Sequence, residues 1–329
     1  MHIGINNGNK NQNIPTTMKK FFATLIVVLC TLGIASAQDM EKATELYNSA
    51  AAAIDNNKAE AITLFEQALE MAEKLGDEGA EIVTQCKGII PKLYMSVGKE
   101  MVNEKNLDEA VARFKKAIEV GEAYGDVEVA EEAKTLIPQI LMADANQALN
   151  AKDYAAAAAG YQKVIDADPA NGQAHLRKGQ ALSALGQMDD AIKAFELASE
   201  NGQEEAAAKQ LSNIYVKKAV ACQKAKDNKG MLENAQKSTQ YVDNANAQKL
   251  IGLSAKELKQ YKVAAEAFEA YLSMNPSASQ KEPQIIYYLG DCLVKTGDNA
   301  KACGYFKSIA QDAKLGEAAR YQITTLKCN

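Results

Sequence analysis

The chain has 329 residues, a formal net charge of −5 and only three arginines. Because nucleic-acid affinity rests mainly on phosphate neutralisation by Lys and Arg, this acidic, arginine-poor composition argues against a nucleic-acid partner. Trp is absent, residues that favour helix (Ala, Lys, Glu, Gln and Leu) are abundant, and no alternating Val/Ile/Thr-rich run indicates a sheet.

The N-terminus predicts export. Two lysines precede an apolar run over residues 21–34, and an A-x-A site ends at Ala37. This is the pattern of a secretory signal peptide over residues 18–37, and the run is shorter than the roughly 20 residues that span a membrane. Residues 1–17 are polar and predict a non-native or disordered extension. We expect cleavage after Ala37 and no integral membrane span in the mature chain; an uncleaved anchor and a lipid on Cys30 are the alternatives.

One short pattern returns along the mature chain. A small residue precedes an aromatic residue by four positions, and another small residue lies twelve positions earlier in most copies. The pairs are Ala61/Phe65, Ala110/Phe114, Ala157/Tyr161, Ala191/Phe195, Ala264/Phe268 and Ala302/Phe306, and the earlier small residues are Gly98, Ala145, Gly179, Gly252 and Gly290. Small residues let two helix backbones approach, and the aromatic ring fills the volume beside them. Since one helix pair cannot bury its apolar face alone, we expect stacked helix pairs.

This pattern resembles the tetratricopeptide repeat, a 34-residue helix pair. Repeats start near residues 42, 91, 138, 172, 212, 245 and 283, and the copy at 212 is degenerate. The resemblance implies an all-α fold, a right-handed α-solenoid of about seven helix pairs. Its N-terminal repeats with long helices would cover residues 38–137, further repeats residues 138–314, and a capping helix residues 315–329.

The first two repeat intervals are longer than the others. Their insertions, residues 76–91 and 125–138, are helical in pattern and end at a proline. Either the following first helix is long and kinked at Pro91 or Pro138, or an extra helix ends there. No loop composition separates the pieces, which favours the long helix.

In the capping helix we expect four side chains to pack inward: Ala318, Tyr321, Ile323 and Leu326.

The mature chain offers little for catalysis. It holds one histidine, His175, which we interpret as a core or rim residue, and a single histidine cannot form a multi-His metal site. No nucleotide-binding glycine loop and no H-E-x-x-H motif is present. We therefore expect no catalytic, metal-binding or cofactor-binding residues, no cofactor, and no enzymatic activity. The alternative, an enzyme or a substrate-binding protein, would need a polar pocket near residues 76–140 with shifted carboxylates.

Five cysteines remain after the predicted cleavage, and an exported chain can form disulfides. Antiparallel packing brings the helix ends that hold Cys292, Cys303 and Cys328 to one edge. A bond between Cys303 and Cys328 would hold the capping helix, and a bond between Cys292 and Cys303 is the rival. Cys222 is expected to be a buried thiol.

The surface of the first helices is the remaining candidate site. The family resemblance implies that these helices line a concave groove in which certain positions face a bound segment. Carried over position by position, they are Met142, Asn146, Leu149, Gln173, Leu176, Gln180, Ser183, Asn246, Lys249, Leu253, Lys256, Tyr287 and Asp291. Mixed polar and aliphatic side chains suit a peptide or a partner helix. We therefore expect a protein–protein interaction scaffold of the bacterial cell envelope, periplasmic or outer-membrane-associated, with a homodimer that uses its own groove as the alternative.

Overall fold

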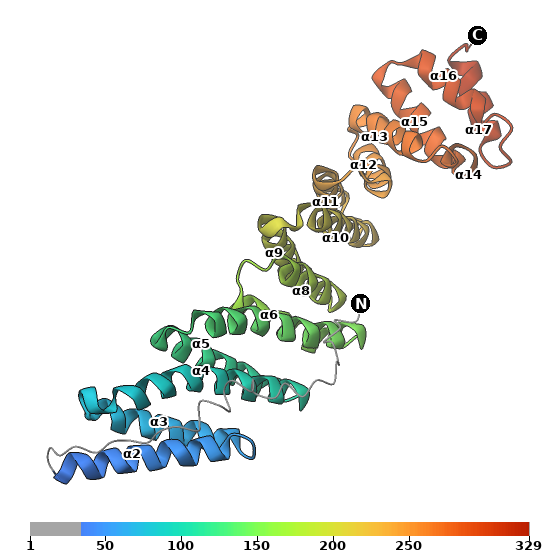
Figure 1. Ribbon diagram of the computed structural model, residues 1–329. Coiled ribbons are helices and arrows are strands. Elements are labelled where there is room, and N and C mark those ends of the chain that lie inside the picture. Colours follow the sequence, from blue (N-terminus) through green and yellow to red (C-terminus); the bar gives the residue numbers. More distant parts are fainter. Residues whose placement is uncertain (1–33, 329) are drawn as a thin grey trace. The chain divides into compact units, whose positions relative to one another are not determined.

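The computed structural model describes residues 34–328, which are helical with short connections and no strand (Figure 1). The predicted extension over residues 1–17 and most of the predicted signal peptide lie outside the described residues. The first described helix begins at Ile34, so cleavage after Ala37 would remove its first turn. The described residues divide into two compact units, with the boundary between Ile140 and Leu141. The boundary falls inside one helix, α6.

The first unit stacks long antiparallel helices, and α3 packs on α2 and α4, while α5 packs on α4. Its helices are α2 (Ile34–Ala53), α3 (Lys58–Lys74), α4 (Ala80–Asn103), α5 (Leu107–Tyr124) and the first part of α6 (Val127–Asn150), with a 3₁₀ turn at Gly76–Gly79. Both α4 and α6 have 24 residues and hold their proline in the interior, Pro91 and Pro138. The interpretation as single long helices is therefore confirmed, and the extra helix is wrong.

The second unit continues the same arrangement with shorter helices. After the end of α6 come α7 (Tyr154–Ala167), α8 (Gly172–Ala184), α9 (Met188–Ala198), α10 (Glu204–Lys224), α11 (Asn228–Tyr241), α12 (Ala245–Glu257), α13 (Tyr261–Met274), the short α14 (Ala278–Lys281), α15 (Pro283–Thr296), α16 (Asn299–Ser308) and α17 (Gly316–Thr325). The two helices of a pair pack on each other, and the second helix packs on the first helix of the next pair, as α9 does on α10, α11 on α12 and α13 on α15. The predicted all-α solenoid class is confirmed.

The contact between a glycine and an aromatic ring sets the spacing within a pair. A Cβ placed on Gly252 of α12 would lie 2.5 Å from the ring of Phe268 on α13. The ring of Phe268 is fully buried, as are the rings of Phe65, Phe114, Tyr161, Phe195 and Phe306. The pairing of small and aromatic residues read from the sequence therefore lies in the cores of these helix pairs, and at Gly98, Gly179, Gly252 and Gly290 the missing side chain lets the ring lie directly on the neighbouring backbone.

Six turns between the two helices of a pair share one hydrogen-bond pattern. At the end of α10, the Lys226 N–H donates to Gln223 and the Asp227 N–H donates to Cys222, which is a Schellman motif. Lys226 has a φ of 58°, in the left-handed region. The Asp227 side chain then accepts from the Gly230 N–H and caps α11. The equivalent left-handed positions are Lys105, Lys152, Gly186, Lys259 and Gly297.

Two expectations are corrected. The helix α10 begins at Glu204, well before the predicted repeat start near residue 212, because Gly202 at φ 83° ends the preceding turn and two acidic residues then open the helix. In α17 the side chain of Tyr321 is 69% exposed rather than packed inward, while Ala319 is fully buried. The side chains of Ala318, Ile323 and Leu326 are half-buried.

Candidate functional site

The first helices of the second unit lie side by side. Among the three first helices α8, α10 and α12, the central helix α10 contacts both of the others. The next first helix, α15, packs on α13 of the preceding pair. These contacts place the predicted groove positions of successive repeats on neighbouring helices. We call this surface the first-helix face, and it comprises Gln173, Gln180 and Ser183 of α8, Val216 and Val220 of α10, Asn246, Lys249, Leu253 and Lys256 of α12, and Tyr287 and Asp291 of α15.

Half-buried apolar side chains recur along the first-helix face. Val216, Val220, Leu253 and Tyr287 all pack against the large apolar cluster of the C-terminal repeats and remain partly open to solvent. The ring of Tyr287 makes an edge contact with Phe306, with 5.5 Å between the centroids. Side chains that are anchored on one side and open on the other offer apolar area to a partner at a small cost in side-chain entropy.

Val216 and Val220 were missed by the sequence analysis. The repeat that contains them is degenerate, and no groove residue was carried over to it. The available indication was that Val216 and Val220 are four residues apart on one helix, and that Val220 has the same position in its repeat as Leu253 has in the next.

Leu176, in contrast, is not available to a partner. Its side chain is 6% exposed and belongs to the core around Phe195. Met142 and Leu149, near the end of α6, are half-buried against the small core around Tyr161. The apolar candidates therefore divide into core residues, residues at the edge of the core, and the open residues of α10, α12 and α15.

Several polar candidates are engaged within the protein. Asn146 accepts a hydrogen bond of 2.7 Å from the buried hydroxyl of Tyr161. Gln180 accepts one from Arg177, at 3.2 Å. The Ser183 hydroxyl lies 3.9 Å from the Met188 sulfur. Gln173 is half-buried and Asn246 is exposed.

Lys249 forms part of a polar triangle between two repeats. Its ammonium pairs with Glu282, which precedes α15, and lies 5.5 Å from the ring centroid of Tyr271. The Tyr271 hydroxyl donates to the same carboxylate at 2.6 Å. Partial burial raises the pKa of Glu282, but the hydrogen bonds from Lys249 and Tyr271 outweigh it, so the pKa lies below its ordinary value. Lys249 thus joins neighbouring repeats, which is a structural role.

Lys256 is a residue of α12 whose side chain contacts α15. Its ammonium is 4.5 Å from the ring centroid of Tyr288 and 3.2 Å from a carboxylate oxygen of Glu257. Burial lowers the pKa of Lys256, but Glu257, Tyr288 and Asp291 together outweigh it and raise the pKa above its ordinary value. The lysine therefore stays charged beside Tyr288, and this end of the first-helix face combines an aromatic ring with a charge pair.

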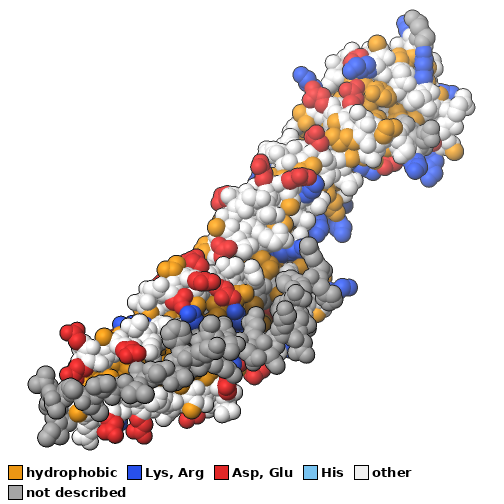
Figure 2. Space-filling view, in the orientation of Figure 1, with side chains coloured by type: hydrophobic (Ala, Val, Ile, Leu, Met, Phe, Trp, Pro, Cys, Tyr) orange, Lys and Arg blue, Asp and Glu red, His pale blue; other side chains and the backbone are white. Residues whose placement is uncertain are grey.

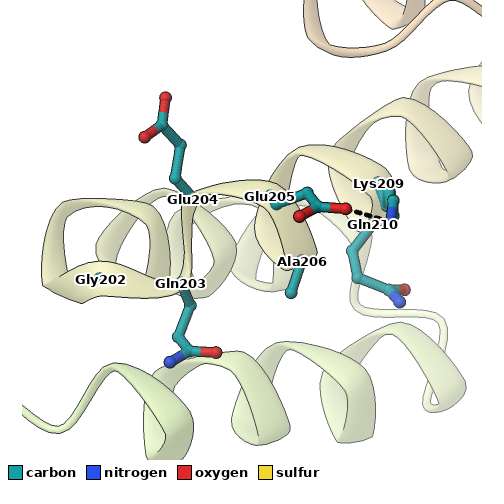
Figure 3. Close-up of a pocket in the computed structure, with 7 residues that line it drawn as sticks. All are labelled: Gly202, Gln203, Glu204, Glu205, Ala206, Lys209 and Gln210. Carbon is teal, nitrogen blue, oxygen red and sulfur yellow. Dashed lines mark hydrogen bonds and ion pairs between the residues drawn. The ribbon is translucent and has the colours of Figure 1, made fainter.

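An open pocket lies elsewhere in the second unit, at the start of α10 (Figure 3). It is lined by Gly202, Gln203, Glu204, Glu205, Ala206, Lys209 and Gln210. Glu205 and Lys209 form a surface ion pair of 2.6 Å, and the hydrogen bond from Lys209 lowers the pKa of Glu205. This pocket is not in residues 76–140, where the enzymatic alternative places a site, and its acidic residues lie at a helix N-terminus, where they favour the helix dipole.

The remaining candidate residues have plain structural surroundings. His175 is 5% exposed, and its Nε2 lies 3.0 Å from the carbonyl oxygen of Pro169. Cys303 and Cys328 form a disulfide, whereas Cys292 is a buried free thiol whose pKa is raised by burial to about 11. Cys222 is a free thiol that is half-buried rather than buried.

No helix among residues 34–328 has the length and apolar character needed to cross a membrane.

The comparisons with known proteins define the class. Tetratricopeptide repeat family models match residues 148–213 and 249–317. The chain contains tetratricopeptide repeats, as the sequence pattern predicted, and repeats of this family are typically interaction modules rather than catalytic domains. A search of curated proteins found no significant match.

Solved structures also match the chain. A crystal structure of MamA protein is 20% identical, with a TM-score of 0.37, and the match covers 55% of this chain and 94% of that chain. A crystal structure of YrrB, described as a TPR protein with an unusual peptide-binding site, is 19% identical, with a TM-score of 0.36, and the match covers 55% of this chain and 91% of that chain.

Proposed function

We propose that this protein is a non-catalytic scaffold of the cell envelope whose first-helix face holds a partner peptide or helix. The observation that carries the proposal is the recurrence of Val216, Val220, Leu253 and Tyr287, each half-buried on a first helix. An amphipathic segment laid along these helices would bury them together. In Figure 2, hydrophobic side chains gather toward the C-terminal end of the second unit, among charged side chains of both signs.

The proposal of export rests on two independent features. The N-terminal sequence has the pattern of a signal peptide, with an A-x-A site at Ala37. A disulfide between Cys303 and Cys328 is a bond that persists in oxidising compartments and is rare in the cytosol. Both features favour a periplasmic or outer-membrane-associated location in a bacterial cell.

The test is affinity capture from an envelope extract with matched variants. Leu253→Glu and Val220→Glu place a charge on the first-helix face, and Leu197→Glu changes a side chain of α9 that is 42% exposed. We expect both face variants to lose the partner that the wild-type protein and Leu197→Glu retain, with circular dichroism showing that all variants are folded. Recovery of the same partner by all four proteins would contradict the proposed face. Capture of the protein's own second copy, checked by solution mass, would assign the homodimer.

A further inference from the structure

The C-terminal helix α17 buries few residues against the last repeat, and the larger apolar side chains in and beside it, Leu315, Ile323 and Leu326, pack there from half-buried positions. It has 10 residues, and only Gly316 and Ala319 among them are buried. The helix α15, by comparison, buries Ile285, Ile286, Leu289, Gly290, Cys292 and Leu293. An isolated helix of this length is marginal in water, and an alanine side chain contributes little apolar area. The position of α17 therefore depends on contacts other than its core packing.

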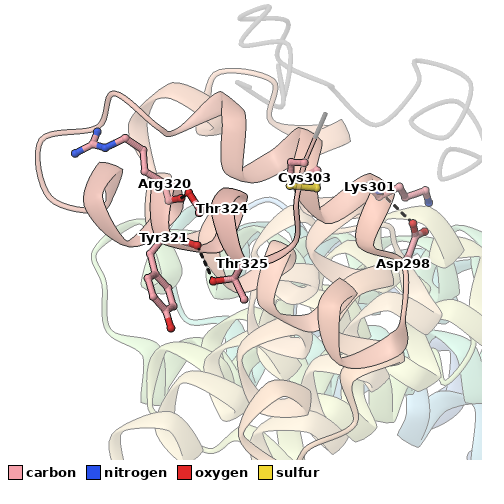
Figure 4. The surroundings of a disulfide bond; sticks show 8 residues. Asp298, Lys301, Cys303, Arg320, Tyr321, Thr324 and Thr325 are labelled. Atoms are coloured by element: carbon pink, nitrogen blue, oxygen red, sulfur yellow. Dashed lines mark hydrogen bonds between the residues drawn. A yellow bond between two sulfur atoms is a disulfide. The ribbon is translucent and has the colours of Figure 1, made fainter.

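Two other contacts hold α17. The Arg320 guanidinium donates to the carbonyl oxygen of Ala310 at 2.6 Å, from an exposed position. The disulfide joins Cys303 of α16 to Cys328, just beyond the end of α17, across a sequence separation of 25 residues (Figure 4). A single exposed hydrogen bond contributes little in water, so the disulfide is the stronger of these two contacts.

We propose that α17 is a redox-dependent cap, which is docked while Cys303 and Cys328 are joined and released when a dithiol reductant opens the bond. One thiolate of the dithiol attacks a sulfur of the disulfide and forms a mixed disulfide, and the second thiol displaces the remaining protein sulfur. The dithiol is oxidised to its own disulfide, and both cysteines become thiols with the two protons that the dithiol gave up. Both cysteines are half-buried, so a small reductant can reach them.

Release of α17 would open the last repeat at one side. Ala319 of α17 belongs to the same apolar cluster as Phe306 of α16 and Ile309, which directly follows α16. Leu315, Ile323 and Leu326 pack against that cluster from their half-buried positions. Without α17, this side of the cluster meets water. A terminal element that covers the last repeat is required in helical repeat proteins, so the oxidised bond keeps the end of the stack closed.

The test is hydrogen exchange on the full chain in the oxidised state and after treatment with dithiothreitol. Among the described cysteines, Cys86, Cys222 and Cys292 are already thiols, so the reductant acts on one bond there. We expect the amides of residues 316–325 to exchange roughly 100-fold faster after reduction, while α12 and α15 keep their protection. Cys328→Ser should show the same change without reductant, and the matched control Cys222→Ser should not.

Equal protection of residues 316–325 in the oxidised and reduced proteins would overturn the proposal. A loss of protection that extends over α12 and α15 would overturn it too, because the disulfide would then hold the repeats themselves rather than a cap. If Cys328→Ser does not fold, the comparison of the oxidised and reduced wild-type proteins decides alone.

Discussion

The ring of Phe114 lies directly on the backbone of Gly98, so that a Cβ placed on Gly98 would be 2.6 Å from Cε1 of the ring. The same relationship joins Gly179 to Phe195 and Gly290 to Phe306, each at 2.7 Å. One glycine and one phenylalanine thus fix the distance between the two helices of a pair. The contact recurs in both units, and it can be tested without any knowledge of a partner.

Gly98→Ala is expected to destabilise the first unit by about 1–3 kcal/mol, because the new methyl group must displace a fully buried ring. The matched control is Gly88→Ala in the same helix, where a Cβ meets nothing within 4 Å. Since alanine is the better helix former, that variant should be more stable than the wild-type protein by up to about 1 kcal/mol. Urea unfolding followed by circular dichroism measures both, and equal effects of the two substitutions would contradict the packing account.

Lys226→Gly should stabilise the second unit by about 1 kcal/mol, since Lys226 has a φ of 58° and glycine adopts this conformation without strain. Lys217→Gly, inside α10 and also exposed, is the control and should destabilise by about 1 kcal/mol. Opposite signs in thermal unfolding are the expected result. A loss of stability in both variants would mean that the lysine side chain makes a contact that outweighs its backbone strain.

The polar triangle around Glu282 predicts a pH dependence. Its folded-state pKa lies below the ordinary 4.5, so its stabilising contribution is present above that pH and is lost as the pH falls through the folded-state value. Glu282→Gln should therefore be less stable than the wild-type protein at pH 7, by up to about 1 kcal/mol because solvent screens this partly exposed pair, and the difference should shrink in acid. The exposed Glu266→Gln serves as control, and a difference for Glu282→Gln that does not change with pH would count against the ion pair with Lys249.

Asn146 is expected to matter for stability whether or not it meets a partner. It accepts the hydrogen bond of the buried Tyr161 hydroxyl, so Asn146→Ala leaves that donor unsatisfied and should cost about 1–3 kcal/mol. In the background of Tyr161→Phe, which lacks the hydroxyl, Asn146→Ala should cost much less. A double-mutant cycle measured by urea unfolding gives the coupling, and additive effects would exclude this bond as the reason.

The fold could be predicted from the sequence because each repeat carries its own core signature. A small residue followed four positions later by an aromatic residue, as in Ala191 and Phe195, is a weak indication of close helix packing by itself, but its repetition in register along the chain makes the indication strong. The start of α10 was misplaced because no proline marks that connection, although Asn201, Gly202 and the two following acidic residues have the pattern of a helix end and a new start.

The side chains of the candidate site were less predictable than the helices that carry them. Lys249, Lys256 and Asn146 stand at positions that the family register assigns to a groove, yet each is bound to a neighbour within the chain. Glu282, Tyr288 and Tyr161, which contact Lys249, Lys256 and Asn146 in that order, lie outside the helix that carries each candidate, so a position on one helix cannot reveal them. Tyr321 shows the same limit at the C-terminus, because a shift by two positions on a short helix moves a side chain from the core to solvent.

The central claim is that a partner lies along the first helices, and site-specific photo-crosslinking tests it most directly. A photoreactive residue is placed at Leu253 or Val220 on the first-helix face, or at Leu197 on α9, in otherwise unchanged protein added to envelope extract. The account predicts one common crosslinked partner from Leu253 and Val220 and none from Leu197. A partner crosslinked from Leu197 and from neither first-helix position would contradict it.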